Sequence, residues 1–140
     1  MNYQQLIAEH DAIAAACDVV TAIAAHAPPR PADATKGLEL LAHLLRDHLA
    51  GEDEVIYQTL LRARGGRHAE TAARMGEQLV RLKEDWESYL YRWDAAQVAA
   101  AWPAFADETA DMLGRIRERV TFETMVLYSL AVHLEVVPTG

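Results

Sequence analysis

Two segments of the chain place residues that can bind a metal ion or a counterion at the same spacing. HLAGEDEVIYQTL starts at His48 and has Glu52 four residues later, whereas RVTFETMVLYSLA starts at Arg119 and has Glu123 four residues later. Residues i and i+4 lie on one face of a helix, a turn apart. Imidazole and carboxylate together suit iron, manganese or zinc, whereas a guanidinium pairs with a carboxylate. The two segments therefore predict different chemistry at equivalent positions.

The elements that must position these residues read as helices. Ala, Leu, Glu and Arg dominate, and alternating β-branched residues are missing. Pro-rich, Gly-Gly and Trp/Ala/Pro segments interrupt the pattern at residues 26–37, 63–68 and 93–103. The prediction is four helices, at about residues 2–26, 34–63, 67–95 and 103–135. Short connections favour antiparallel neighbours, so we expect an all-α, up-down-up-down four-helix bundle that forms one domain over residues 1–140.

Spacings of three and four residues give each predicted helix one inward stripe, which is apolar except at a single level. At that level the four stripes carry His10, His48, Glu52, Gln78, Arg119 and Glu123. A lone carboxylate buried in an apolar core costs several kcal/mol, so these groups must pair with one another or bind metal. Bundles build metal sites from side chains that point inward from several helices.

LIAEHDAI, followed by LLRDHLAGEDEVIYQTL, resembles the hemerythrin-like HHE cation-binding domain, and the resemblance covers essentially the whole chain. It implies a four-helix bundle with His on helix 1, His-x-x-x-Glu on helix 2, His on helix 3 and His-x-x-x-Glu on helix 4. It implies metal ligands at the positions of His10, His48, Glu52 and Glu123. Where the family has two further histidines, this chain has Gln78 and Arg119, and both departures fall on the second metal ion.

Arg119 carries a permanent charge that can offset Glu52 and Glu123 where a second metal ion would lie. Two arrangements are compatible with these residues. In one, a single metal ion is held by His10, His48 and a carboxylate, with Arg119 on the other side. In the other, no metal binds, and Arg119 and the helix-3 glutamine tie the carboxylates and histidines into a buried polar network.

Three functions follow from these alternatives. The first is metal binding or sensing, for which the resemblance implies a small diatomic molecule or peroxide as ligand. Reversible oxygen binding draws two electrons from two irons, so we expect that this chain is not an oxygen carrier. The second is a metal-free structural or interaction module. The third is a non-haem iron enzyme that acts on peroxide or nitric oxide; the sequence shows no substrate pocket for it, so we lean against an enzyme.

Charge and hydropathy limit the partners. A net charge of −8 argues against nucleic acid and anionic membrane surfaces. No apolar run reaches the roughly 18 residues of a membrane span, and the N-terminus has no secretory signal pattern. With a single cysteine, Cys17, we expect a cytoplasmic protein. Aromatic residues late in helix 3, together with Trp102 and Phe105, offer a surface for a homo-oligomer.

Overall fold

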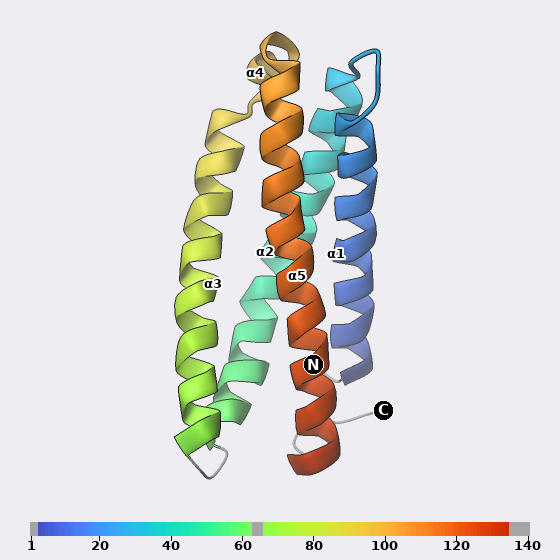
Figure 1. Cartoon of the computed structure of the whole chain (residues 1–140). Coiled ribbons are helices and arrows are strands. Elements are labelled where there is room, and N and C mark those ends of the chain that lie inside the picture. The colour runs from blue at the N-terminus through green and yellow to red at the C-terminus, as the bar shows by residue number, and fades with distance from the viewer. Residues whose placement is uncertain (1–2, 63–65, 135–140) are drawn as a thin grey trace.

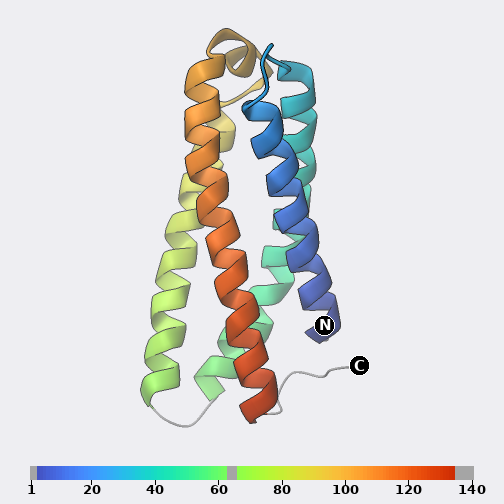
Figure 2. The same cartoon turned by 45° about the vertical axis from the view of Figure 1, so that its right-hand side comes forward.

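The computed structural model describes the backbone of residues 3–62 and 66–134, and the side chains of residue 5 and residues 7–48, 70, 73–74 and 76–125. Every described element is a helix: α1 (Tyr3–Ala24), α2 (Pro31–Arg62), α3 (Gly66–Arg92), α4 (Ala95–Ala100) and α5 (Trp102–Leu134). Figures 1 and 2 show α1, α2, α3 and α5 side by side, each long helix antiparallel to the next along the chain. The prediction of an all-α, up-down-up-down bundle of four long helices is confirmed.

The connection at residues 93–103 contains a fifth, short helix rather than a simple break. Asp94 caps the start of α4, because its Oδ1 accepts a hydrogen bond from the backbone N–H of Gln97 at 2.9 Å. Pro103 lies in the first turn of α5, where a missing N–H removes no helical hydrogen bond. Figure 1 shows α4 at the end of the bundle where α3 joins α5, and its Val98 is fully buried there.

On α1, α2 and α5 the described core follows helical spacings of three and four residues. On α1, for example, Ile13, Cys17, Val20 and Ala24 are buried. A buried hydrogen bond joins the Tyr89 hydroxyl on α3 to the Thr109 hydroxyl on α5 at 2.6 Å, so the polar atoms in this part of the core have partners. None of the described helices is both long enough and apolar enough to cross a bilayer.

Most aromatic side chains at the end of α3 and the start of α5 belong to this core. Trp86, Tyr89, Trp93 and Phe105 are all buried. Phe105 is fully buried, and its ring lies 5.4 Å from Trp93 and 5.5 Å from the half-buried Trp102, centroid to centroid. Tyr91 differs, with 90% of its surface exposed. The expectation of an oligomer interface at Trp102, Phe105 and the end of α3 therefore assumed an exposure that most of these side chains do not have.

Close packing of α1 against α2 requires one glycine. A Cβ atom added to Gly37 on α2 would lie 2.8 Å from Cγ2 of Val20 on α1, closer than two carbon atoms pack. Gly37 thus lets α1 and α2 approach each other closely at this position.

Candidate metal centre

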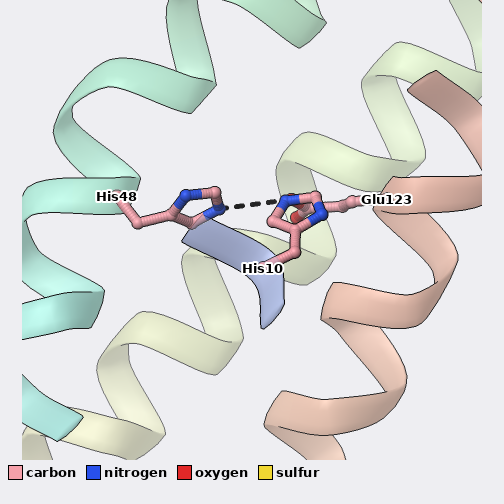
Figure 3. A group of neighbouring side chains, drawn as sticks. All are labelled: His10, His48 and Glu123. Atoms are coloured by element: carbon pink, nitrogen blue, oxygen red, sulfur yellow. Dashed lines mark ion pairs between the residues drawn. The ribbon is translucent and has the colours of Figure 1, made fainter. Parts of the chain in front are cut away.

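Three buried polar side chains from three helices meet in the bundle. His10 on α1 and His48 on α2 are each 2% exposed, and Glu123 on α5 is 1% exposed. Each continues the apolar stripe of its helix, which explains why the fold carries all three inward. One ligand atom from each residue lies within 4.8 Å of the others. Figure 3 shows the two imidazoles and the carboxylate pointing toward a common space.

The histidine Nε2 atoms face the same carboxylate oxygen. His10 Nε2 lies 3.8 Å and His48 Nε2 lies 3.9 Å from Glu123 Oε2. These separations exceed hydrogen-bond distance. They are compatible with a shared ion, because two ligands at about 2.1 Å from one metal lie at most about 4.2 Å apart.

Glu9 contacts the Nδ1 atom of His48, the ring nitrogen that does not face Glu123. His48 Nδ1 lies 3.0 Å from Glu9 Oε1 on α1. A carboxylate only accepts hydrogen bonds, so Nδ1–H is the donor and neutral His48 has a lone pair on Nε2. This carboxylate–histidine arrangement is the one that commonly orients a metal-binding imidazole.

Thr124 does the same for His10. The Thr124 hydroxyl donates to the backbone carbonyl of Val120 at 3.0 Å, which uses its single proton. The 2.5 Å contact between His10 Nδ1 and Thr124 Oγ1 therefore has the imidazole as donor. The neutral His10 ring then also has its lone pair on Nε2. The sequence pattern did not identify Glu9 and Thr124 as site residues, although each is adjacent in sequence to a candidate ligand.

Arg119 occupies the opposite side of the carboxylate. Its Nε donates a short hydrogen bond to Glu123 Oε1, one turn along α5, and the two side chains are 9% and 2% exposed. Glu123 thus divides its two oxygens between a guanidinium and the two imidazoles. This geometry places a fixed positive charge beside the carboxylate.

A small cavity of about 30 Å³ adjoins the centre, with room for a water or a similarly small molecule. Its lining is mostly apolar and comes from α2, α3 and α5: Leu45, His48, Leu79, Leu82, Lys83, Trp86, Ile116, Arg119, Val120 and Glu123. Leu82 and Arg119 also line a larger surface hollow of about 300 Å³. These two side chains therefore stand between the hollow and the cavity.

The remaining expected site residues lie elsewhere. Gln78 is exposed and lines the outer hollow, so the expectation that it points inward is wrong; Leu79, 4% exposed, takes the buried position on α3. The side chain of Glu52 lies outside the described residues, although its backbone is part of α2. The structure thus brings together four of the six expected residues: His10, His48, Arg119 and Glu123.

The chemistry of this donor set fits a metal ion. Two neutral imidazole nitrogens and one carboxylate oxygen present lone pairs to one buried space, and iron, zinc and manganese all accept such ligands. The Arg119 guanidinium contacts the other oxygen of the same carboxylate.

Comparison with known proteins agrees with this site. The family model for the hemerythrin HHE cation binding domain matches residues 1–131. Searches of curated proteins and of solved structures give no significant match. Because the family match spans nearly the whole chain, including all three convergent residues, the chain belongs to the hemerythrin HHE cation-binding domain family.

Proposed function

We propose that this protein binds one divalent metal ion through His10, His48 and Glu123, and that Arg119 takes the place of the second ion. The observation that supports this most strongly is the convergence of two imidazole Nε2 atoms on Glu123 Oε2. Glu52, one turn after His48 on α2, is a further candidate ligand from the family resemblance.

The charge around the centre favours one ion over two. A second divalent ion next to Glu123 would lie close to the Arg119 guanidinium, and two such charges about 4 Å apart repel by several kcal/mol even at an effective dielectric constant near 20. Reversible oxygen carriage needs two irons, so we propose that the protein is not an oxygen carrier. When bound, a single ion would supply a Lewis-acidic centre with coordination positions open to a small ligand.

The apolar cavity beside the centre supports a small ligand, such as a diatomic molecule or peroxide, and so a sensing role. A cavity of about 30 Å³ has no room for an organic substrate of ordinary size. The residues around the ion then have distinct tasks. The histidines and Glu123 hold the ion, the apolar side chains limit the size of what approaches it, and Arg119 fixes one carboxylate oxygen.

Metal analysis of untagged protein tests the proposal. The protein is loaded anaerobically with Fe²⁺, Mn²⁺ or Zn²⁺, desalted, and its metal content measured by mass spectrometry. We expect about one equivalent of at least one ion, and less than about a tenth in His48→Ala and Glu123→Gln. His43→Ala is the matched control, because His43 lies on α2 with 63% of its side chain exposed and pairs with Asp47. Less than a tenth of an equivalent of every ion, or a stable two equivalents, contradicts the proposal.

A metal-free structural module is the second candidate, and the Arg119–Glu123 ion pair favours it. That pair neutralises the buried carboxylate without any metal. Unfolding temperatures that stay the same with a strong chelator and with added metal support this second reading. A rise of several degrees on metal addition, absent in His48→Ala, supports the metal-binding function instead.

A further inference from the structure

We propose that Glu9 and Thr124 are positioning residues of the metal centre. They hold His48 and His10 in the tautomer that turns both Nε2 lone pairs toward Glu123 Oε2. The inference rests on the proposed function for its purpose, but the tautomers themselves are a property of the metal-free protein. They can therefore be measured whether or not an ion binds.

The two contacts act on different nitrogens from the ones that face the centre. Glu9 Oε1 lies 3.0 Å from His48 Nδ1, and Thr124 Oγ1 lies 2.5 Å from His10 Nδ1. In free neutral histidine the proton prefers neither nitrogen strongly, so a single hydrogen bond at Nδ1 is enough to select the tautomer. Without it, the proton can move to Nε2, where it would block the ligand position.

Each contact crosses from one helix to another, which orients the rings as well as the protons. Glu9 on α1 reaches His48 on α2, while Thr124 on α5 reaches His10 on α1. The two rings meet edge to face, with centroids 4.8 Å apart and planes at 71°. The three helices are thus joined through the same rings that would hold the ion.

The two partners differ in charge, which makes their effects separable. Glu9 is a carboxylate with 31% of its side chain exposed, so it stays hydrated while it contacts the buried His48. Its negative charge makes His48 a stronger electron donor. It also offsets the repulsion that the positive charge of Arg119 exerts on a bound cation. Thr124 is neutral, so it orients the His10 ring and selects its tautomer without adding charge. Glu9 is therefore expected to affect metal affinity more than Thr124.

Nitrogen NMR of the metal-free protein tests the tautomers directly. With ¹⁵N-labelled histidine at a pH where the rings are neutral, long-range proton–nitrogen correlations identify the protonated nitrogen of each ring. We expect Nδ1–H for both His10 and His48 in the wild type. Glu9→Leu should shift His48 toward Nε2–H and leave His10 unchanged. Thr124→Val should shift His10 toward Nε2–H and leave His48 unchanged. Thr124→Ser, which keeps the hydroxyl, should restore the wild-type pattern.

Zinc affinity, measured by chelator competition, tests the consequence. Glu9→Leu should weaken Zn²⁺ binding about 10- to 100-fold, and Thr124→Val should weaken it less. Glu9→Gln, which keeps an accepting oxygen but loses the charge, should fall between Glu9→Leu and the wild type. Asp11→Asn is the matched control, because Asp11 is an exposed acid on the same helix, and it should bind like the wild type.

The outcomes separate this inference from the proposed function. Nε2–H tautomers in the wild type, or tautomers that do not respond to Glu9→Leu and Thr124→Val, overturn the inference even if one ion binds. Failure of the wild type to bind any ion overturns the proposed function, while the tautomer measurement still decides the roles of Glu9 and Thr124. Far-ultraviolet circular dichroism of each variant confirms that it is folded.

Discussion

Removal of Arg119 should expose how much the bundle depends on its buried ion pair. Arg119→Met keeps a long unbranched side chain and removes the charge, which leaves the Glu123 carboxylate without the guanidinium in a position only 2% exposed. Loss of one partner of a buried pair costs about 3–5 kcal/mol. The Arg119 side chain is itself 9% exposed, so water can reach part of the vacated space. We therefore expect the lower end, about 3 kcal/mol, a large share of the stability of an ordinary domain.

A double-mutant cycle isolates the pair. Urea unfolding is measured for the wild type, Arg119→Met, Glu123→Leu and the double variant, at pH 7 with chelator present. We expect each single change to destabilise and the double change to cost less than the sum, with a coupling energy of about 2–3 kcal/mol. An exposed pair gives a contrast: Arg115 contacts Asp85 at 2.8 Å, with the two side chains 47% and 54% exposed. Arg115→Met should cost less than about 1 kcal/mol.

Two results would refute this reasoning. A coupling energy below about 0.5 kcal/mol for Arg119 and Glu123 would make the pair equivalent to an exposed one. A change in the urea m-value between variants would mean that the compactness of the unfolded or native state, or two-state unfolding itself, has changed, so the difference could not be assigned to the ion pair. The same variants can be tested with zinc, where Arg119→Met should gain more stability than the wild type because the competing cation is gone.

Further predictions concern the packing and the buried titratable groups. Gly37→Ala should destabilise the protein by about 1–2 kcal/mol, because the new Cβ would lie 2.8 Å from Val20 Cγ2. Gly114→Ala should stabilise it by about 0.5–1 kcal/mol, because the new Cβ would meet no neighbouring group within 4 Å. Thermal unfolding measures both changes. Burial raises the pKa of Cys17 from 9.0 and that of Tyr89 from 10.0, each to about 12. Both groups ionise first in the unfolded chain, so their contribution to stability is complete below pH 9 and is lost as the pH rises from 9 to 12. Urea unfolding across that range should show the loss, and Cys17→Ala should remove the part that begins near pH 9.

The sequence was sufficient for the fold and for the three convergent residues because both depend on helical periodicity. His10, His48 and Glu123 each extend an apolar stripe, so burial of the stripe carries them inward. The same reasoning placed Gln78 inward, and there it was wrong. Counting back from Leu82 by four residues gives Gln78, whereas counting by three gives Leu79. A regular seven-residue repeat from Trp93 through Trp86 selects Leu79, and the structure agrees.

The contacts of Glu9 and Thr124 with the two histidines depend on how the helices face one another. The apolar stripe of a single helix does not specify this. Glu9 and Thr124 each lie about 100° around their helix from the adjacent candidate ligand. From the sequence alone, such a position can face solvent or a neighbouring helix. Only the placement of α1 between α2 and α5 gives both side chains a histidine to contact. A polar residue adjacent in sequence to a buried candidate ligand is thus a useful sign of a positioning residue. It can be assigned only when the helix that it faces is known.

The double variant of Arg119 and Glu123 also distinguishes two roles of the buried polar layer formed by His10, His48, Arg119 and Glu123: metal binding and support of the fold. Replacement of a buried ion pair by apolar residues of similar size is often neutral or stabilising, so the pair is weak grounds for a structural role. Arg119 Nε donates to Oε1 of Glu123, and Oε2 faces His10 and His48 at 3.8 and 3.9 Å. If the double variant is as stable as the wild type but has lost its metal, the layer serves binding at no net gain in stability. If the double variant is destabilised and the wild type holds no metal, the layer serves the fold, and the metal-binding function fails.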